Sequence, residues 1–387
     1  MRIQEFELNE VAEPPRLADR LEHATEFSCS AGTFQLQRFR LTDGPRAGVE
    51  LLVVDSGRVR AAICPTRGMS LWKARFDNLD FGWKSPVQGP IHPSFVASAE
   101  PSGIGWLDGF DELLARCGLR SFGAPDFDAA GRVQFAVHGR VGNLPAQNVQ
   151  VHFEPQHSQL HVLGEVNETR FLQYNLRLTS TYTFRFDEPT IEVRDRVTNA
   201  GGTPTSMQIL YHVNIGQPIL EGGAKLHLAA AQIAARDHRA AEDLQQWDTY
   251  LPPTTGYAEQ VYFSESVAGR DGWSTALLTD SQAERGFALH YQPTTLPYFS
   301  QWKNTVAEAD GYVTGLEPAT GFPNPRSFEE ARGRTVALAA GESRDFHLRL
   351  EGIAHEDRVA QIAAELAGIR GSKPAPAAPT HPDWCPK

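Results

Sequence analysis

Apolar and polar residues alternate along much of this 387-residue chain. The alternation has a period of two in five segments, which are Thr33–Leu41, Gln147–Pro155, Tyr174–Phe186, Thr190–Asn199 and Arg344–Leu350. A period of two is typical of a strand with one buried face and one solvated face. Turn sequences rich in glycine and proline, such as Thr-Asp-Gly-Pro at 42–45, separate these segments. Successive strands of this kind predict antiparallel sheets packed as a sandwich.

Helical patterns are few. Residues 105–119 predict a short amphipathic helical turn around Phe110, Leu113 and Leu114. Residues 355–371 predict a terminal helix that ends at Gly371, with an apolar face made of Val359, Ile362, Ala363 and Leu366. The proline-rich residues 371–387 have little to bury and are interpreted as a loose tail or strap. We therefore expect an all-β fold with a few short helices, in which residues 1–370 form one domain with its core at about 33–350.

The acidic net charge of the chain argues against nucleic acids and anionic membranes as its main binding partners. The chain carries 47 acidic and 36 basic residues, a net charge of −11, whereas nucleic acids and anionic membranes attract basic surfaces. The sequence begins without the apolar stretch of a signal peptide, and it has no run of 18 apolar residues. Four cysteines without zinc-like spacing, Cys29, Cys64, Cys117 and Cys385, are expected to be free thiols in a reducing cytoplasm. A homodimer is one assembly that the sequence leaves open.

Polar side chains interrupt apolar surroundings in three stretches, Val137–Ala146, Tyr211–Pro218 and Gly311–Asn324. Each stretch has a strand-like run, then a histidine or glutamate, then a turn with glycine or proline. That order places a functional side chain at the end of a strand on a rigid scaffold. Taken singly, His138 and His212 are interpreted as hydrogen-bonded core residues, and Glu317 is interpreted as the end of a strand or the partner of an arginine. Together the three indicate a site.

Other kinds of site have weaker signals. His152, His157 and His161 are close in sequence, but they alternate along an apparent hairpin and do not have the usual spacing of zinc ligands. The nucleophile motif Gly-x-Ser-x-Gly and the glycine-rich phosphate-binding loops are absent from the sequence. We therefore expect neither a metal centre nor a nucleotide site.

In the three stretches the chain resembles the aldose 1-epimerase (galactose mutarotase-like) superfamily. The matching motifs are His138-Gly139, then His212-Val213-Asn214, then Leu316-Glu317-Pro318, in the order found in that superfamily. The resemblance spans roughly residues 33–350, and each motif is short, so its specificity comes from the combination. Residues 105–119, 138–146 and 298–323 point to a divergent aldose-epimerase-like branch of unknown function.

The resemblance implies a β-supersandwich with an open sugar-binding cleft. It also implies that His212 is the general acid, Glu317 the general base and His138 a second histidine beside the ring oxygen. Interconversion of α and β anomers removes a proton from O1 and adds one to O5, so that the ring opens to the aldehyde and recloses. A carboxylate and an imidazolium can catalyse these proton transfers in both directions, and the reaction needs no cofactor.

This sequence also departs from the better-known mutarotases, because it lacks their Asn-Arg-Ile segment before the His-Gly turn. The candidates to replace that segment's sugar contacts are Arg67, His92, Asp108, Asp111 and Arg116. Arg140, directly after the His-Gly turn, is expected to contact substrate or to orient a carboxylate. Arg67 could instead pin a turn, and Asp111 and Arg116 could be solvated helix charges. Trp302 offers an indole face for a sugar or is a buried core residue, while Lys303 and Asn214 complete the set of candidate contacts. Arg67, Arg140 and Lys303 together would suit an anionic sugar.

Two other functions stay open. A carbohydrate-binding or sensing protein would keep the cleft without turnover. A lyase or glycosidase would need a long groove, and hydrolysis would need two carboxylates about 5–10 Å apart. The His212–Glu317 combination favours an enzyme, a cytoplasmic mutarotase acting on a monosaccharide or sugar derivative.

Overall fold

The computed structural model describes residues 20–370 and 375–386, and most of its regular structure is in two large β-sheets. The first sheet has fourteen strands, which are β1 (Arg20–Ser28), β2 (Thr33–Arg40), β3 (Glu50–Asp55), β4 (Val59–Cys64), β5 (Ser70–Phe76), β6 (Leu79–Phe81), β7 (Leu114–Leu119), β14 (Thr205–Ile215), β16 (Ala230–Ala235), β17 (Gln260–Ser266), β20 (Tyr298–Asn304), β21 (Val313–Ala319), β22 (Val336–Leu338) and β24 (Ala377–Ala378).

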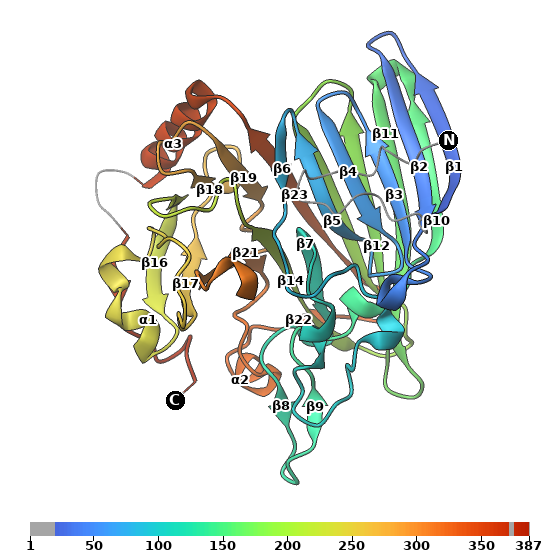
Figure 1. The fold of residues 1–387 in the computed structure, drawn as a ribbon. Helices are drawn as coiled ribbons and strands as arrows, with labels where there is room; N and C mark the ends of the chain where they lie inside the picture. The colour runs from blue at the N-terminus through green and yellow to red at the C-terminus, as the bar shows by residue number, and fades with distance from the viewer. Residues whose placement is uncertain (1–19, 371–374, 387) are drawn as a thin grey trace.

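The second sheet has eight strands, which are β10 (Gln147–Glu154), β11 (Gln159–Arg170), β12 (Tyr174–Arg185), β13 (Thr190–Asn199), β15 (Lys225–Leu228), β18 (Ser274–Thr279), β19 (Gly286–Tyr291) and β23 (Ser343–Ile353). A separate hairpin, β8 (Asp126–Phe127) with β9 (Val133–Phe135), projects from the body (Figure 1). Among the described strands, only β16 and β24 pair in parallel. The prediction of an all-β sandwich of antiparallel sheets is confirmed.

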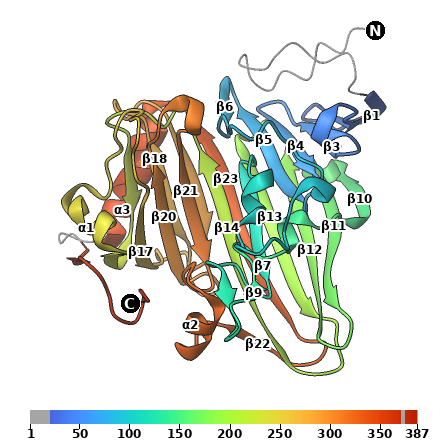
Figure 2. The same cartoon turned by 60° about the horizontal axis from the view of Figure 1, so that its bottom comes forward.

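The two sheets bury a shared core between them. In Figure 1, β1–β5 lie in front of β10–β13, and Figure 2 shows β20, β21 and β14 side by side in the other half. In β11 the buried residues Leu160, Val162 and Val166 alternate with more exposed ones, as expected for one buried face. Strand β14 differs, because every residue from Met207 to Ile215 is buried. Both faces of β14 are therefore covered, one by the sandwich core and the other by the residues described below.

The five segments predicted from period-two alternation are all strands, within a few residues at their ends. The helical turn predicted around Leu113 and Leu114 is wrong, since a 3-10 turn spans Gly105–Gly109 and the chain then extends into β7. Leu114 pairs with Leu71 of β5 and with Val213 of β14. Sheet hydrogen bonds on both sides outweigh the weak helical period of this segment.

Three α-helices lie within the described residues, α1 (His238–Glu242), α2 (Arg326–Ala331) and α3 (Glu356–Arg370). The terminal helix is confirmed by α3, whose residues Val359, Ile362 and Leu366 are buried on the predicted face. The predicted end at Gly371 lies outside the described residues. Beyond α3, Trp384 and Cys385 are buried beside Phe322. The described part of the tail is therefore a strap, and Trp384 gives it an apolar anchor that the interpretation from composition missed.

Candidate functional site

Two neighbouring strands place the predicted acid and base opposite each other. Strands β14 and β21 are antiparallel, and Val213 pairs with Leu316. The same register sets the preceding residue, His212, opposite Glu317. On the other side of β14, His212 pairs with Ala115 of β7. Directly opposed residues on one face have their Cβ atoms about 5 Å apart, so the sheet itself brings these two side chains together.

The neighbouring positions on these strands face the opposite way, into the sandwich. Tyr211 pairs with Arg116, and the Arg116 guanidinium contacts Asp195 of β13 through Nε–Oδ2 (2.5 Å) and Nη2–Oδ1 (3.0 Å). Arg116 is fully buried and also donates to the hydroxyl of Ser180 on β12. It therefore ties the two sheets together from within the core. The prediction of Arg116 as a solvated helix charge or a sugar contact is replaced by this internal role.

The side chains of His212 and Glu317 are both buried, and they lie in close contact with each other. The exposed fractions are 4% for His212 and 2% for Glu317, and Nε2 of the imidazole lies 3.3 Å from Oε1 of the carboxyl group. Among the described residues, Oε1 has no hydrogen-bond donor of good geometry. The space for this contact comes from Gly315, where an added Cβ would lie 2.4 Å from that oxygen and 3.0 Å from Cε1 of His212. Any larger residue would displace the pair.

Asn214 holds the far side of the imidazole. Its Oδ1 lies 2.6 Å from Nδ1 of His212, while its Nδ2 donates to the carbonyl oxygens of Glu112 (2.9 Å) and His212 (3.1 Å). Asn214 is fully buried. It was predicted as a substrate contact, but the structure places it behind His212, where it fixes the ring.

Aromatic rings surround the pair. The His212 ring lies 5.1 Å from that of Phe110, 6.1 Å from Trp106, 5.7 Å from Trp302 and 5.2 Å from His138, measured between centroids. His138 and Trp302 are only half-buried, so the cluster reaches the surface at these two rings. Nδ1 of His138 is hydrogen-bonded to the carbonyl oxygen of Phe122. The three predicted catalytic residues thus lie together beside an indole wall.

Trp302 is held in place by a charged pair at the edge of the cluster. Its Nε1–H donates to Oε2 of Glu259 at 2.7 Å. Glu259 in turn accepts from Nη2 of Arg236 at 3.0 Å, and Arg236 also binds Asp237. Trp302 was predicted near the site and lies there, whereas Glu259 has no sequence signal that distinguishes it from other surface glutamates.

Burial shifts all three titrating groups toward their neutral forms. Burial, reinforced by the charge of Glu259 and opposed by Arg236, raises the pKa of Glu317 to about 8. Burial and the neighbouring His138 hold the pKa of His212 well below its usual value. Burial lowers the pKa of His138 to about 4, against the hydrogen bond to Phe122. Such shifts in one cluster are typical of functional sites, although structural groups can also show them.

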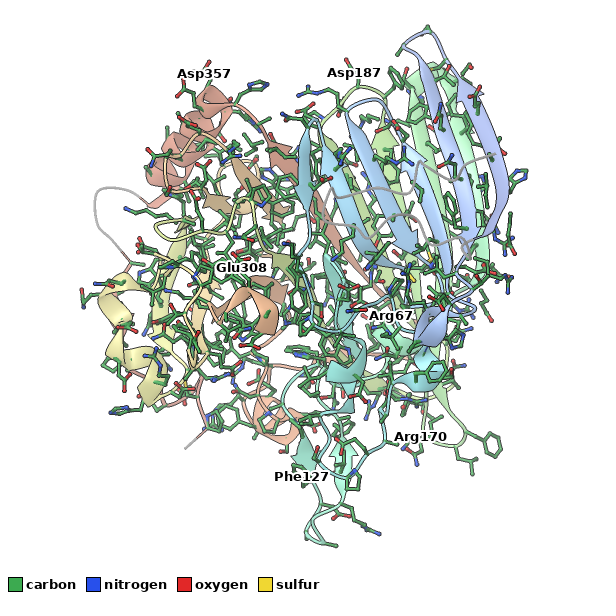
Figure 3. The ribbon with its side chains drawn as sticks, viewed as in Figure 1. Arg67, Phe127, Arg170, Asp187, Glu308 and Asp357 are labelled. Carbon is green, nitrogen blue, oxygen red and sulfur yellow. The ribbon has the colours of Figure 1, made fainter. Side chains whose placement is uncertain are left out.

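Arg67 and Asp111, both predicted as sugar contacts, lie in internal networks. Arg67 is 1% exposed and donates to the Glu112 carboxylate, the Asn143 side chain and two backbone carbonyl groups. Figure 3 shows it among the side chains that fill the centre of the molecule. Asp111 is buried and accepts from the side chains of Trp72 and Lys73. Glu112 and Gly109 lie on either side of Phe110, so this network fixes the segment that carries Trp106 and Phe110, two rings of the aromatic wall around His212. This agrees with the alternative prediction that Arg67 pins a turn.

The other predicted cationic contacts also lie elsewhere. Lys303 is buried on the face of β20 opposite Trp302 and donates to the carbonyl oxygens of Gln246 and Thr249. Arg140 donates to the hydroxyl of Tyr174 at 3.4 Å. Nδ1 of His92 accepts from the backbone of Ser94 and caps a 3-10 turn. The structure therefore does not bring Arg67, Arg140 and Lys303 together as an anion-binding set.

Two residues of the aromatic wall, Trp106 and Phe110, and the spacer Gly315 were not predicted as site residues. The first two lie in the segment that was taken for a helix, and no local motif marks Gly315. Within the described residues, no three histidine, cysteine, aspartate or glutamate side chains are arranged to hold a metal ion. The four cysteines are unpaired thiols. None of the helices in residues 20–370 and 375–386 has both the length and the apolar character of a membrane span.

A family model described as "Domain of unknown function (DUF4432)" matches residues 46–351. The chain belongs to the DUF4432 family. A search of curated proteins gives no match. Among solved structures, this DUF4432 protein is similar to a candidate aldose 1-epimerase from Klebsiella pneumoniae, with 29% identity over 90% of this chain and 91% of that one and a TM-score of 0.87.

More distant structures share the fold. A galactose mutarotase-like protein from Clostridium acetobutylicum is 12% identical over 79% of this chain and 96% of its own, with a TM-score of 0.57. The galactose 1-epimerase from Lactobacillus acidophilus is 10% identical over 86% and 99%, with a TM-score of 0.52. The DUF4432 chain therefore has the galactose mutarotase-like β-sandwich fold, as its motifs indicated.

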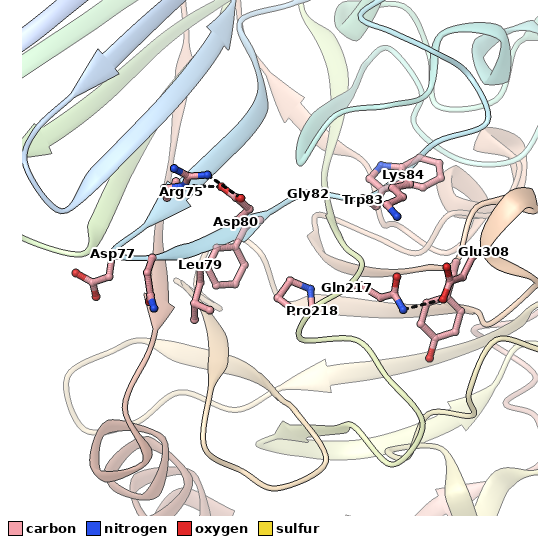
Figure 4. A pocket seen from close by; sticks show the side chains of 13 residues that line it. Arg75, Asp77, Leu79, Asp80, Gly82, Trp83, Lys84, Gln217, Pro218 and Glu308 are labelled. Carbon is pink, nitrogen blue, oxygen red and sulfur yellow. Dashed lines mark hydrogen bonds and ion pairs between the residues drawn. The ribbon is translucent and has the colours of Figure 1, made fainter. Parts of the chain in front are cut away.

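A separate crevice of about 780 Å³ lies where β6 approaches the loop after β14 (Figure 4). Part of its polar lining is already engaged, since Arg75 binds Asp80 and Gln217 donates to Glu308. Trp83 lines this crevice and also packs against Phe110. Neither His212 nor Glu317 is among the lining residues. The His212–Glu317 pair is therefore not part of this crevice.

Proposed function

We propose that this DUF4432 protein is an enzyme that interconverts the α and β anomers of a monosaccharide or sugar derivative. The observation that carries the proposal is the buried His212–Glu317 pair, opposed across adjacent strands at 3.3 Å on a galactose mutarotase-like fold. A binding protein has no need to keep two titrating groups out of water, because burying an unpaired ionisable group costs free energy.

The residues around the pair fit a sugar as substrate. Trp302, half-buried next to His212, provides an indole face, and the apolar face of a pyranose ring packs well on such a surface. His138, half-buried beside both His212 and Trp106, can exchange a hydrogen bond with a sugar oxygen through Nε2, because its Nδ1 is bonded to Phe122. Ring opening needs one group to protonate O5 while another takes the proton from O1, and His212 and Glu317 provide those two groups.

The proposal is tested by measuring anomeric exchange by NMR in a panel of neutral, acidic and keto sugars. We expect the wild-type protein to accelerate exchange of at least one sugar. Acid–base assistance is worth about 10²–10⁴-fold in rate, so His212→Asn and Glu317→Gln should each lose about that factor.

The matched control is Glu351→Gln, which alters a second buried His–Glu contact in the other sheet. This variant should keep the wild-type exchange rate. Binding of sugars without any acceleration by the wild-type protein would instead support a carbohydrate-binding or sensing protein. Equal losses in Glu317→Gln and Glu351→Gln would show that the rate reports only on folding.

A further inference from the structure

The hydrogen bonds of Asn214 determine which nitrogen of His212 can exchange a proton. Nδ2 of Asn214 donates to two backbone carbonyl oxygens, those of Glu112 and His212, so its amide group cannot be turned around without losing both bonds. Oδ1 must then face Nδ1 of His212, at 2.6 Å. An amide oxygen only accepts hydrogen bonds. Nδ1 therefore carries a hydrogen, and in the neutral ring Nε2 has the lone pair that faces Glu317.

The surroundings of Glu317 disfavour a carboxylate anion. The carboxyl group is 2% exposed, and its Oε1 has no hydrogen-bond donor of good geometry within the described chain. Arg236, whose charge lowers the pKa of Glu317, is already bound to Glu259 and Asp237. A buried carboxylate that lacks a counter-ion and donors is costly, whereas a protonated carboxyl group is neutral and can itself donate.

Apart from Arg236, the titratable groups on the elements packed against the pair do not favour its ionised form. Strand β7 contributes the buried thiol of Cys117, the loop before β17 contributes Glu259, and the turn after β9 contributes His138. The carboxylate of Glu112, in the segment before β7, is neutralised by Arg67. Negative Glu259 opposes ionisation of Glu317, and His138 opposes protonation of His212. None of these groups stabilises a separated anion and cation in the pair.

We propose that the resting pair holds a single exchangeable proton on Glu317, that Nε2 of neutral His212 is the proton acceptor, and that Asn214 is the positioning residue that fixes this arrangement. Glu317 is then the general acid and His212 the general base, the reverse of the roles implied by the family resemblance. The shifts in pKa, upward for Glu317 and downward for His212, agree with this assignment.

The sugar step, which rests on the proposed function, balances with these roles. Glu317 gives its proton to O5 as the C1–O5 bond breaks, and the O1–H proton passes to Nε2 of His212 as the C1=O1 double bond forms. The open-chain aldehyde then lies beside a carboxylate and an imidazolium, with the two groups' nearest atoms 3.3 Å apart in the resting site. Rotation about C1–C2 and the reverse transfers close the ring as the other anomer and restore the resting pair.

The proposal is tested without sugar, by NMR of protein labelled with ¹⁵N in histidine and ¹³C in glutamate side chains. Signals are assigned by their loss in His212→Asn and Glu317→Gln. At pH 7 we expect His212 to be neutral with the hydrogen on Nδ1, and Glu317 to be protonated and to titrate near pH 8. A carboxylate at position 317, or a hydrogen on Nε2 of His212, at pH 7 overturns the proposal.

Two internal comparisons sharpen the test. Glu351 should remain ionised from pH 4 to 9 in the same spectra, since its pKa is about 2. Asn214→Asp places a carboxylate against Nδ1 and should convert His212 to the imidazolium at pH 7. If the His212 signals do not move in this folded variant, Asn214 is not a positioning residue. Because no sugar is present, these results stand apart from the exchange assay, and failure of exchange would overturn only the proposed function.

Discussion

Two buried histidine–glutamate contacts occur within the described residues 20–370, one in each large sheet. His212 and Glu317 lie 3.3 Å apart on β14 and β21, and His290 and Glu351 lie 3.1 Å apart on β19 and β23. All four residues are at most 5% exposed. The two pairs thus have the same residue types, nearly the same distance and the same burial, but the pKa values of their glutamates move in opposite directions.

The difference comes from the hydrogen-bond donors that reach Glu351, which are His290 and an arginine, Arg358. Burial alone would raise the pKa of Glu351, but hydrogen bonds from His290 and from Arg358 of α3 outweigh it and lower that pKa to about 2. Arg358 binds both carboxylate oxygens, at 2.6 and 2.9 Å. In the part of the chain that the structure describes, no such cation binds Glu317, whose pKa is raised to about 8. A neutralised pair anchors a helix to the sheet, whereas a pair without a counter-ion keeps a proton available for transfer.

The largest effect is expected from removing the arginine. Arg358→Met leaves buried Glu351 without its cation and should lower the free energy of unfolding at pH 7 by about 2–3 kcal/mol, toward the low end for broken buried pairs because Arg358 is partly exposed. Wild-type Glu351 has a lowered pKa, so its stabilising contribution is present above about pH 4.5 and is lost toward pH 2. Urea unfolding should therefore show a deficit that shrinks as the pH falls to 2.

The control for this substitution is Arg344→Met on the exposed end of β23. An exposed arginine away from such a network should change the unfolding free energy by less than about 0.5 kcal/mol. If the two variants lose the same stability, the bidentate contact of Arg358 does not explain the low pKa of Glu351.

A smaller effect should follow from crowding the other pair. In Gly315→Ala the new methyl group would lie 2.4 Å from Oε1 of Glu317, so the carboxyl group must move. Displacement of a reacting group by about 1 Å can cost roughly 10²-fold, and we expect anomeric exchange to slow by about 10–100-fold.

Gly368→Ala is the matched control, because an added Cβ in that part of α3 meets no atom within 4 Å. It should leave exchange unchanged and stabilise the helix by about 0.5–1 kcal/mol. Wild-type exchange in Gly315→Ala would mean that the contact between His212 and Glu317 is not required for the rate.

The comparison also shows how far sequence reasoning reaches. Period-two alternation predicted strands such as β12 and β13 well, because a strand with one buried face has apolar residues at every second position. The short motifs predicted that His138, His212 and Glu317 would meet. The motifs could not predict which charged residues lie next to the buried pairs and their surroundings. Arg358 and Glu259 are brought to their partners, Glu351 and Trp302, only by tertiary packing.

The cationic residues that were wrongly predicted as sugar contacts also depend on tertiary packing that the sequence does not show. Arg67, Lys303 and Arg116 look like surface cations in the sequence, yet each is buried with its donors engaged. Burial of a long cationic side chain depends on acceptors supplied by distant elements, such as Asp195 for Arg116. The sequence did contain one usable signal for Trp302 and Lys303. They are adjacent in a strand, adjacent residues of a strand face opposite sides of the sheet, and so only one of the two could face His212.

A further effect concerns the pH dependence of exchange. The raised pKa of Glu317 means that its proton is lost as the pH rises through about 8. If that proton is used in the reaction, kcat/KM should fall about tenfold per pH unit above this value, because only the protonated fraction of free enzyme is competent. The rate profile should be measured from pH 6 to 10, with spontaneous exchange subtracted at each pH. A flat profile up to pH 10 would contradict a proton held by Glu317.

The last effect concerns the pH dependence of stability, and its sign separates the two pairs. Between pH 4.5 and 8 unfolded Glu317 is ionised while the folded residue keeps its proton, so the folded state loses stability as the pH rises through this range. Glu317→Gln removes that loss, so the free energy of unfolding of this variant should rise relative to that of the wild type as the pH increases from 5 to 8.5.

Glu351→Gln should behave in the opposite way. The lowered pKa of Glu351 gives the wild type stability above about pH 4.5, so this variant should be less stable at pH 7 and approach the wild type near pH 2. Urea unfolding of both variants across pH 2 to 8.5 therefore yields two difference curves of opposite sign. Comparing each variant with itself across pH cancels the fixed cost of burying an amide. Parallel curves would mean that Arg358 does not set the two pairs apart.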